Sequence, residues 1–372
     1  MERALKGKKD VIWMHVASLG EYEQGLPVLE KLKIEYPDYS FLLTFFSPSG
    51  YEVKKNNAPV DLVCYLPLDT IGNANRFLQL AKPKLAIFIK YEIWPNYLHA
   101  LKKHEIPTLM VSGMFYEKQI FFKPWGGFMR KRLQTFHHFF VQNESSKKLL
   151  NQIELTSVTV NGDTRFDRVA AILDSDNRLD FMDTFKQDAL CIVAGSTWPE
   201  DMAVLLPFVN QYEGDAKWVI APHTIKPEAI EKLRAQIKKP TVTYSELGNN
   251  DISKADVFIV DTIGLLTKIY SYADIAYVGG GFATGLHNTL EPAVFGIPVI
   301  IGPQYKGFNE AETLVQAKGV LSIASKKELE EVLFELLKNA DSRKKTGEIN
   351  ARLIQSSQGA TDEVVRYVKT IL

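Results

Sequence analysis

The feature that most constrains this chain is the alternation of two patterns along its length. Short apolar runs, bounded by glycine, proline or small polar residues, alternate with longer stretches in which apolar residues recur at helical spacing. This order is typical of β-α-β units, whose helices connect parallel strands of one sheet. The sequence therefore predicts an α/β fold with doubly wound parallel sheets. The expected strands are residues 11–17, 40–46, 62–65, 85–90, 108–112, 138–142, 158–160, 190–194, 218–221, 257–260, 275–278 and 299–301.

The chain is long enough for two domains, because it has 372 residues and a domain usually has about 100–200. A polar passage over 173–187 has little apolar periodicity and separates two sets of strands. We therefore predict an N-terminal domain over 1–180 and a C-terminal domain over 181–359. The amphipathic end of the chain, 360–372, predicts a helix that could pack on either domain, including back on the first. Since parallel sheets bind ligands at the carboxyl ends of their strands, the two domains are expected to share a cleft.

Composition argues against several classes of protein. The 44 basic and 44 acidic side chains leave no net charge, whereas proteins that bind nucleic acid through bulk electrostatics usually carry a basic excess. No apolar run reaches the roughly 20 residues that span a bilayer, and the N-terminus lacks the apolar core of a signal peptide. We therefore expect a soluble, cytoplasmic protein with no nucleic-acid partner.

The cysteines and histidines do not predict a metal site. Cys64 and Cys191 lie inside apolar runs, where a cysteine is usually a small core residue. The seven histidines lack HxH or HxxxH spacing, and the adjacent His137 and His138 would point to opposite faces of a strand. We therefore expect neither a structural metal nor a disulfide.

The turn after the first expected strand, Ser18-Leu19-Gly20-Glu21, allows two interpretations. Ser18 suits the N-cap of a helix and Glu21 its third position, so Glu21 could bind only backbone N–H groups in a capping box. The same turn lies at the carboxyl end of a strand, where a carboxylate can face a bound hydroxyl group and act as a general base. The spacing does not separate these interpretations, because both need the same residue.

A glycine-rich turn follows a strand in the second half. Gly279, Gly280 and Gly281 would let the backbone approach a ligand, and the helix start after them offers free N–H groups to a phosphate. Glu291 could form a capping box with Asn288, or accept hydrogen bonds from ribose hydroxyls. The turn is neither GxGxxG nor GxxxxGK[ST], which disfavours a dinucleotide enzyme or a P-loop kinase.

Three further groups of residues could face a ligand at strand ends. Ser196 and Thr197 start a helix, where they are either ordinary caps or contacts to a phosphate or carboxylate. Arg165 lies in the charged stretch 162–168, where it could bind an anion bidentately or belong to a surface ion-pair cluster. Glu92 follows an apolar strand and is expected at the cleft rim or at a helix N-terminus.

The segment 114–133 combines aromatic rings with cations. This composition suits a surface that sets rings into the acyl boundary of a membrane and cations on anionic head groups. The alternative, which composition leaves equally open, is a buried helix hairpin whose cations are solvated. The residues that would contact lipid are Phe115, Phe121, Phe122, Lys123, Trp125, Arg130, Lys131 and Arg132.

Seven ordered stretches resemble the 3-deoxy-D-manno-octulosonic acid (Kdo) transferase family. They are HVASLGE (15–21), FFSPSGYE (45–52), LPLD (66–69), KYEIWPN (90–96), GDTRFD (162–167), AGSTWPED (194–201) and GGGFATGLHNTLEPA (279–293). None is decisive alone, but their order and spacing are specific, and the similarity spans about residues 11–361. The variants FFSPSGYE, KYE and GDTRFDR resemble the Bacteroidetes branch of the family.

The resemblance implies a fold and an activity. The fold would be the GT-B glycosyltransferase fold, with an N-terminal acceptor domain and a C-terminal donor domain facing a central cleft. The activity would be transfer of Kdo from CMP-Kdo to the lipid A precursor in lipopolysaccharide biosynthesis, with inversion at the anomeric carbon. The enzyme would act at the cytoplasmic face of the inner membrane, with that membrane surface as a partner.

The resemblance also assigns roles to residues. Glu21 would be the general base that deprotonates the acceptor hydroxyl. The expected donor-binding residues are Arg165, Ser196, Thr197, His223, Gly279, Gly280, Gly281, Asn288 and Glu291, and the expected acceptor-binding residues are Ser18, Gly20, Ser49 and Glu92. With cations and N–H groups on the leaving phosphate, neither a metal nor another cofactor would be required.

The chain departs from the family pattern at several positions. His223 stands where many members have arginine, Trp198 where a histidine is common, and Arg165 where lysine is usual. The last change keeps the charge but alters its geometry. The family has an N-terminal membrane anchor, whereas this sequence begins shortly before its first strand. We therefore expect either a preceding segment absent from this sequence or attachment through 114–133 alone.

Two other functions remain open at the level of sequence. One is another GT-B nucleotide-sugar enzyme, such as a UDP-sugar transferase or a UDP-sugar 2-epimerase. The other is a non-catalytic protein that binds a nucleotide sugar or a lipid. A preference for CMP over UDP would distinguish a Kdo transferase from a UDP-sugar enzyme. A transfer assay would distinguish it from a non-catalytic binding protein.

Overall fold

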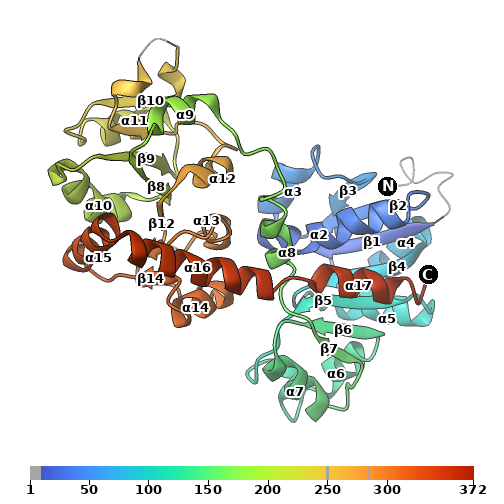
Figure 1. Ribbon diagram of the computed structural model, residues 1–372. Coiled ribbons are helices and arrows are strands. Elements are labelled where there is room, and N and C mark those ends of the chain that lie inside the picture. Colours follow the sequence, from blue (N-terminus) through green and yellow to red (C-terminus); the bar gives the residue numbers. More distant parts are fainter. Residues whose placement is uncertain (1–9, 249–250, 284) are drawn as a thin grey trace. The chain divides into compact units, whose positions relative to one another are not determined.

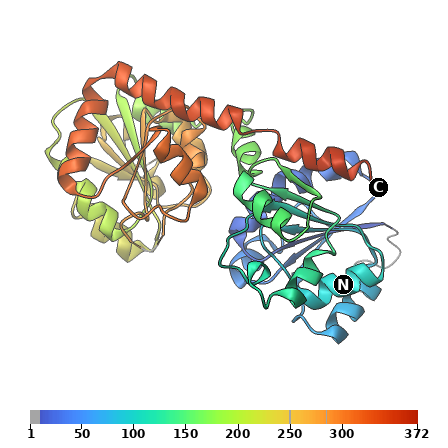
Figure 2. The same cartoon turned by 90° about the horizontal axis from the view of Figure 1, so that it is seen from below.

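The computed structural model describes residues 10–248, 251–283 and 285–372. The chain forms two compact units, Met1–Arg168 with Ser357–Leu372, and Val169–Ser356 (Figure 1). Each unit contains one seven-stranded sheet, and helices cover both faces of each sheet (Figure 2). This is the doubly wound α/β architecture that the alternation of apolar runs and amphipathic stretches predicts.

The sheet of the first unit has the strand order β3-β2-β1-β4-β5-β6-β7, with parallel pairing throughout. The chain starts in the middle, winds to one edge, and then returns to the other side of β1. Every strand expected in the first half is present, with bounds that differ by a residue or two. The strands are β1 (Val11–Val16), β2 (Ser40–Phe45), β3 (Leu62–Tyr65), β4 (Pro83–Ile89), β5 (Thr108–Gly113), β6 (His138–Val141) and β7 (Val158–Val160).

The helices of the first unit begin at polar caps that the sequence provides. Thr70 Oγ1 accepts a hydrogen bond from Asn73 N at 3.2 Å, and Asn143 Oδ1 accepts one from Ser146 N at 2.8 Å. The helices are α2 (Leu19–Glu35), α3 (Pro48–Lys54), α4 (Ile71–Ala81), α5 (Pro95–Lys103), the 3₁₀ helix η1 (Ile120–Phe122), α6 (Gly127–Leu133), α7 (Glu144–Gln152), α8 (Arg165–Ala170) and α17 (Ala360–Val368).

Two apolar layers, one on each face of the sheet, stabilise the first unit. Trp13 lies in one layer, with ring centroids 4.7 Å from Phe77 of α4 and 5.9 Å from Tyr97 of α5. The next residue, Met14, lies in the opposite layer with Leu29 of α2, because successive side chains of a strand point to opposite faces. A strand covered on both faces is therefore apolar at nearly every position.

The last helix, α17, completes the first unit (red in Figure 1). Its apolar face packs beside α2 in the second of these layers, through Val364, Val365 and Val368. Asp167 accepts hydrogen bonds from the backbone N–H groups of Gly359 at 2.6 Å and Thr361 at 2.7 Å, which fixes the start of the helix. Of the two placements that the sequence leaves open for this helix, the structure has the one on the N-terminal domain.

The division between the units falls after Arg168, earlier than the expected boundary at residue 180. The segment after it is held by polar contacts to the second unit. Leu179 N donates to Tyr272 Oη at 2.7 Å, and Lys186 Nζ lies 2.8 Å from Asp274 Oδ2. Polar contacts of this kind leave no apolar periodicity in the sequence. The domain boundary expected from periodicity, at residue 180, therefore falls after the one in the structure.

The sheet of the second unit has the order β10-β11-β9-β8-β12-β13-β14, again parallel. The strands are β8 (Leu190–Thr197), β9 (Ala216–Pro222), β10 (Thr241–Thr243), β11 (Val257–Ile259), β12 (Ile275–Val278), β13 (Val299–Ile301) and β14 (Val320–Ser322). The two edge strands, β10 and β14, were not among those expected. Neither β10 (TVT) nor β14 (VLS) is an uninterrupted apolar run, unlike β11 (VFI) and β13 (VII), which have the same length of three residues and were expected.

The helices of the second unit alternate with these strands. They are α9 (Asp180–Lys186), α10 (Pro199–Gln211), α11 (Pro227–Arg234), η2 (Tyr244–Glu246), η3 (Ile252–Lys254), α12 (Leu266–Ile269), η4 (Tyr270–Tyr272), α13 (Leu290–Ala293), α14 (Asn309–Gln316), α15 (Lys326–Lys338) and α16 (Ala340–Ser356). One apolar layer joins α10 and α15 to the sheet through Leu205, Trp218 and Leu333.

Candidate active site

The first group of candidate residues lies at the carboxyl end of β1. This strand pairs with β2 on one side and β4 on the other, so the chain changes direction across the sheet at this point. Doubly wound sheets bind ligands where the strand order reverses. The turn 17–21 follows β1, the loop 46–50 follows β2, and the loop 90–94 follows β4. Three of the stretches that the sequence singles out therefore meet at one edge of the sheet.

The carboxylate of Glu21 is buried in the turn after β1, with 6% of the residue exposed. Its Oε2 accepts hydrogen bonds from Ala17 N at 2.5 Å and Ser18 N at 3.2 Å. The bond from Ser18 N is the one that a capping box requires. Its Oε1 accepts no hydrogen bond from the part of the chain that the structure describes. One oxygen therefore stabilises the helix start, and the other is available to a ligand.

The surroundings of Glu21 raise its pKa from 4.5 to about 7. Burial is the largest cause, because it disfavours the charged carboxylate, and the negative charge of Glu92 is the second. The N–H groups of Ala17 and Ser18 and the charge of Lys90 act in the opposite direction. A carboxylate whose pKa lies near neutrality is suited to accept a proton as a general base.

The loop after β2 packs directly against this turn. Ser47 N donates to Ala17 O at 2.7 Å. A Cβ on Gly50 would lie 3.0 Å from Leu19 N and 2.4 Å from the Phe45 ring, so the two loops approach each other through a glycine. The structure thus brings together the stretches that contain the expected acceptor-binding residues. Of these, Gly20 and Ser49 are exposed and Ser18 is half-buried.

Glu92, the remaining expected acceptor-binding residue, faces a histidine that sequence reasoning missed. Its Oε2 accepts a hydrogen bond from Trp94 Nε1 at 2.9 Å and lies 3.4 Å from His15 Nε2. His15 is fully buried on β1, and its Nδ1 lies 2.8 Å from Thr44 Oγ1 on β2. The available signal was a single histidine inside an otherwise apolar strand.

Several acidic residues in the stretches that resemble the Kdo transferase family have structural roles. Asp69 accepts hydrogen bonds from Asn96 N and Tyr97 N at 3.1 Å each, and so caps α5. Asp163 binds the guanidinium of Arg165, with Nη2 to Oδ2 at 2.7 Å. Arg165 thus lies in the first unit and is already paired with a carboxylate, which is the ion-pair alternative that the sequence left open.

The glycine-rich turn in the second unit is required by packing. A Cβ on Gly279 would lie 2.3 Å from Ser196 O, and one on Gly281 would lie 2.7 Å from Gly302 N. Gly280 has a φ of +94°, a region that residues with a side chain rarely adopt. In the structure these glycines are needed because they let the loop after β12 lie against protein backbone. The sequence argument had instead expected them to make room for a ligand.

Asp201 joins the loops after β8 and β12. It is fully buried at the start of α10, where its Oδ2 accepts hydrogen bonds from Trp198 N at 2.8 Å and Gly280 N at 2.9 Å. Its Oδ1 accepts one from the Tyr277 hydroxyl at 2.7 Å. This carboxylate was missed as a site residue because two of its partners, Tyr277 and Gly280, lie 76 and 79 residues further along the chain.

The pair expected to bind ribose, Asn288 and Glu291, is engaged within the protein. Glu291 Oε1 accepts a hydrogen bond from Asn288 Nδ2 at 3.0 Å, and its Oε2 accepts one from Thr267 Oγ1 at 2.9 Å. The helix that follows, α13, has only four residues. Its dipole is therefore weaker than the sequence argument for a phosphate at this helix start assumed.

Three aromatic side chains form a stack beside these loops. The rings of Trp198 and His223 are parallel, with centroids 4.2 Å apart, and His223 lies 4.9 Å from His287. Trp198 Nε1 donates to His287 Nε2 at 3.2 Å. Burial, followed by the nearby His223, lowers the pKa of His287. Two of the positions where the chain departs from the family pattern, 198 and 223, are thus in direct contact.

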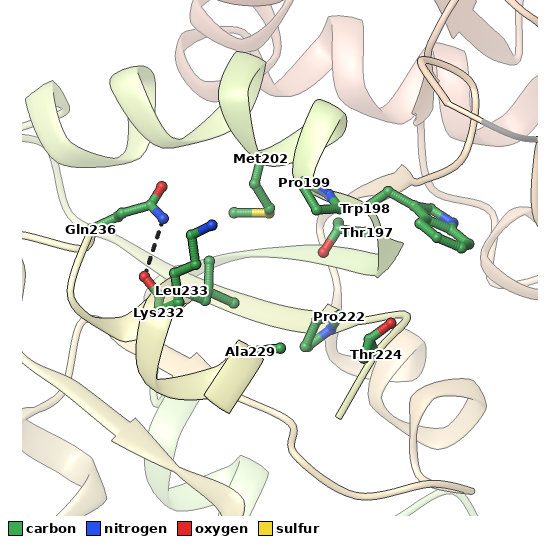
Figure 3. Close-up of a pocket in the computed structure, with 10 residues that line it drawn as sticks. All are labelled: Thr197, Trp198, Pro199, Met202, Pro222, Thr224, Ala229, Lys232, Leu233 and Gln236. Atoms are coloured by element: carbon green, nitrogen blue, oxygen red, sulfur yellow. Dashed lines mark hydrogen bonds between the residues drawn. The ribbon is translucent and has the colours of Figure 1, made fainter. Parts of the chain in front are cut away.

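A cavity of about 530 Å³ lies between α10 and α11 in the second unit (Figure 3). Thr197, Met202, Pro222 and Leu233 line it, and the Trp198 ring points away from it. Thr197 Oγ1 is buried and, among the residues that the structure describes, has no hydrogen-bond partner. Of the expected donor-binding pair Ser196 and Thr197, Thr197 therefore lines this pocket.

The aromatic residues of segment 114–133 are partly core residues. Phe115 and Phe121 are 2% and 6% exposed, and Phe122 packs against the same layer. The expected lipid contact is therefore wrong for Phe115 and Phe121, which are buried in the apolar layer, while Phe122 is half-buried and its lipid contact stays a prediction. Arg130 is also engaged, since its Nη1 donates to the Lys123 carbonyl at 2.7 Å.

The remaining residues of this segment do form an exposed group. Trp125 is 76% exposed and Phe128 is 61% exposed, and Ile120 also reaches the surface. The Arg132 guanidinium lies over the Phe128 ring, 4.8 Å from its centroid. Exposed cations, Lys118 and Lys131, belong to the same segment. We refer to Ile120, Trp125, Phe128, Lys118, Lys131 and Arg132 as the aromatic-basic surface.

The described ranges contain neither a metal-binding cluster nor a membrane-spanning helix. Among residues 10–248, 251–283 and 285–372, no three His, Cys, Asp or Glu side chains are arranged to hold a metal ion. Within the same ranges, every helix is too short or too polar to cross a membrane.

Comparisons with known proteins agree with this architecture. Residues 1–168 match a family model described as 3-Deoxy-D-manno-octulosonic-acid transferase (kdotransferase). A 3-deoxy-D-manno-octulosonic acid transferase from Rickettsia bellii is 27% identical over 370 residues, covering 96% of this chain and 87% of that protein. A UDP-N-acetylglucosamine 2-epimerase structure from Listeria monocytogenes, described as putative, matches with a TM-score of 0.65 at 13% identity, covering 97% of this chain and 96% of that one.

A further solved structure, MurG from Acinetobacter baumannii, matches with a TM-score of 0.61 and 13% identity, over 97% of this chain and 99% of that one. At these identities the structural matches show the fold alone, which is the two-domain GT-B fold. The sequence matches are narrower. They point to the 3-deoxy-D-manno-octulosonic acid (Kdo) transferase family, a family of glycosyltransferases, through a family model that matches residues 1–168 and relatives of that name that cover nearly the whole chain.

Proposed function

We propose that this protein transfers Kdo from CMP-Kdo to a lipid A precursor, with inversion at the anomeric carbon and Glu21 as the general base. The match of residues 1–168 to the Kdo transferase family model and the similarity of nearly the whole chain to Kdo transferases support the reaction. The observation that carries the assignment of the base is the buried Glu21 carboxylate, whose pKa is raised to about 7 at the carboxyl end of β1.

In the proposed step, Glu21 accepts the proton of a primary hydroxyl group on the acceptor sugar. The acceptor oxygen forms a bond to the anomeric carbon of Kdo as the bond from that carbon to the phosphate oxygen breaks. The electron pair of the broken bond leaves with CMP. Since Oε2 already accepts two backbone hydrogen bonds, Oε1 is the atom that receives the proton.

The second unit would bind the donor at the loops after β8, β9 and β12. Positive charge and N–H groups must stabilise the leaving phosphate. His223 is exposed beside these loops, and Asp201 holds the backbone of residues 198 and 280 in place. We propose that these groups stabilise the departing CMP without a divalent metal.

Replacement of Glu21 by Gln tests the base. The variant keeps an acceptor for the backbone N–H groups but cannot take a proton at neutral pH, so transfer is expected to fall by about 10²–10⁴-fold. CMP affinity should stay nearly unchanged. Donor CMP-Kdo is generated in situ, and product is read by mass spectrometry. Glu30→Gln, an exposed position on the same helix, is the matched control. A substantially active Glu21→Gln enzyme would refute the assignment.

Nucleotide preference tests the donor. The GT-B fold is shared with enzymes that act on UDP-sugars, so fold alone does not select the nucleotide. CMP should raise the unfolding temperature of the protein, whereas UDP should not. The reverse preference would favour the alternative of a UDP-sugar enzyme, and CMP binding without transfer would favour a non-catalytic binding protein.

We further propose that the aromatic-basic surface attaches the protein to the cytoplasmic face of the inner membrane. Its exposed rings and cations suit an interface that contains anionic lipid. The wild-type chain should sediment together with vesicles that contain anionic lipid. The double variant Trp125→Ala, Phe128→Ala should bind these vesicles more weakly. Ile34→Ala, an exposed apolar residue of α2, is the control. Equal binding by all three proteins would contradict this role.

A further inference from the structure

His15 is a buried polar residue for which the proposed reaction has no role. It lies on β1, is fully buried, and its Nε2 has no hydrogen-bond partner among the residues that the structure describes. The nearest carboxylate oxygen is Glu92 Oε2, 3.4 Å away. A buried donor or acceptor without a partner is unfavourable, so this arrangement calls for an explanation.

The contacts of Nδ1, on the other side of the His15 ring, indicate which ring nitrogen carries the proton. Thr44 Oγ1 lies 2.8 Å from both Trp13 Nε1 and His15 Nδ1, and 3.5 Å from Met14 O. Trp13 Nε1 can only donate, so the single hydroxyl proton of Thr44 goes to a different neighbour. The short distance favours His15 Nδ1, which then accepts, and the proton of the neutral ring is on Nε2.

The charge of Glu92 leads to the same assignment. A lone pair on His15 Nε2 would face a carboxylate oxygen at 3.4 Å in a buried site, which is repulsive. An N–H at that position is attracted to the carboxylate. Hydrogen bonds of this kind are often long in the absence of substrate and shorten in the complex.

We propose that His15 is a positioning residue, which donates from Nε2 to Glu92 and so holds the Glu92 carboxylate beside the base Glu21. This inference rests on the proposed function. Trp94 Nε1 donates to the same oxygen at 2.9 Å, so two side chains fix one oxygen of Glu92 from different directions. The negative charge next to Glu21 then has a defined place.

The placement of Glu92 matters because of the other groups around Glu21. The charge of Glu92 raises the pKa of Glu21, while the charge of Lys90 lowers it. Tyr91 is also affected by this site, since burial and then the charge of Glu21 raise the pKa of its hydroxyl group. If Glu92 moves away, its negative charge no longer offsets the positive charge of Lys90. The pKa of Glu21 then falls, and Glu21 becomes a weaker base. The acidic limb of the pH profile of kcat/KM should then move to lower pH.

Two substitutions of His15 separate the hydrogen bond that Nε2 donates to Glu92 from the contact that Nδ1 makes with Thr44. His15→Gln can place an amide N–H near the position of Nε2, whereas His15→Asn reaches only as far as Nδ1 and Thr44. We expect His15→Asn to lose on the order of tenfold or more in kcat/KM relative to His15→Gln, and to shift the acidic limb to lower pH. The two amides differ by one methylene, so a merely structural role would change their stability to different extents but would leave the acidic limb where it is.

A double-mutant cycle tests whether His15 acts through Glu92. Glu92→Gln should shift the acidic limb by about one pH unit, because a like charge beside Glu21 is removed. In the Glu92→Gln background, His15→Asn should cause no further shift. Unchanged pH profiles in His15→Asn and Glu92→Gln, or additive shifts in the double variant, would overturn the inference. If His15→Asn does not fold, an unchanged profile in Glu92→Gln alone would overturn it.

The failure of the proposed function gives a different result. If the wild-type chain does not transfer Kdo, the reaction is refuted. The coupling can still be measured without substrate, as the pH dependence of unfolding of the first unit. A smaller pH dependence in His15→Asn than in His15→Gln would support the inference, and equal dependence would refute it.

Discussion

The raised pKa of Glu21 predicts that Glu21→Gln stabilises the first unit at high pH. The folded chain holds the carboxyl proton over a pH range where the unfolded chain has lost it, because the pKa rises from 4.5 to about 7 on folding. The contribution of the protonated group is therefore fully present below pH 4.5 and is lost as the pH rises through about 7. Glutamine has no charge to bury and so avoids this loss.

The magnitude follows from the size of the rise. At about 1.4 kcal/mol for each pH unit, a rise from 4.5 to about 7 corresponds to at most about 3.5 kcal/mol of stability above pH 7. Near pH 5 most of this loss has not yet occurred. The stability of Glu21→Gln relative to wild type should thus grow by about 2 kcal/mol between pH 5 and pH 8. Packing and hydrogen-bond changes cancel in this comparison, since they are present at both pH values.

The assay should report on the first unit alone. Hydrogen exchange of a peptide containing β1, read by mass spectrometry, measures its opening, and comparing the two proteins at each pH removes the intrinsic exchange rate. Glu30→Gln is the control and should show no such growth. A difference between Glu21→Gln and wild type that is the same at pH 5 and pH 8 would refute the raised pKa, and with it the argument that Glu21 is poised as a base.

Three other predictions concern the second unit and the leaving group. Gly281→Ala should destabilise the protein, because its Cβ would lie 2.7 Å from Gly302 N, whereas Gly72→Ala, whose Cβ would meet nothing within 4 Å, should be tolerated; thermal unfolding compares them. Asp201→Asn should cost about 2–4 kcal/mol and weaken CMP binding in calorimetry, because the amide cannot accept all the hydrogen bonds that hold Gly280 and its neighbours. Chelation by EDTA should leave Kdo transfer unchanged, and activity that is lost and then restored by a divalent cation would contradict the proposed metal-free departure of CMP.

Most of the fold could be predicted because parallel strands buried on both faces have a clear pattern. Strand β1 is the best case, since Trp13 and Met14 enter opposite apolar layers and both must be apolar. The failures lie where this pattern is absent. Strands β10 and β14 include polar residues and lie at the sheet edges, and the segment before residue 180 is anchored by polar contacts such as Leu179 to Tyr272.

The candidate site was predictable where its residues are close in sequence. Glu21 follows a strand and a cap within a few residues, so the local sequence was enough to place it at the end of that strand. His15 could not be assigned in this way, because its partners Thr44 and Glu92 are distant in sequence. Composition also failed to sort the aromatic residues of 114–133, because an inward Phe115 and an outward Trp125 look alike until packing is known.

The position of α17 has a consequence for the synthesis of this protein. The helix is made after the whole second unit, yet it covers apolar side chains of the first unit, the rest of which is made before the second unit. On a ribosome the first unit must therefore wait, with one face uncovered, until the whole second unit has emerged. A chain that stops early cannot close this face, so an incomplete product would carry an exposed apolar surface that chaperones and proteases recognise.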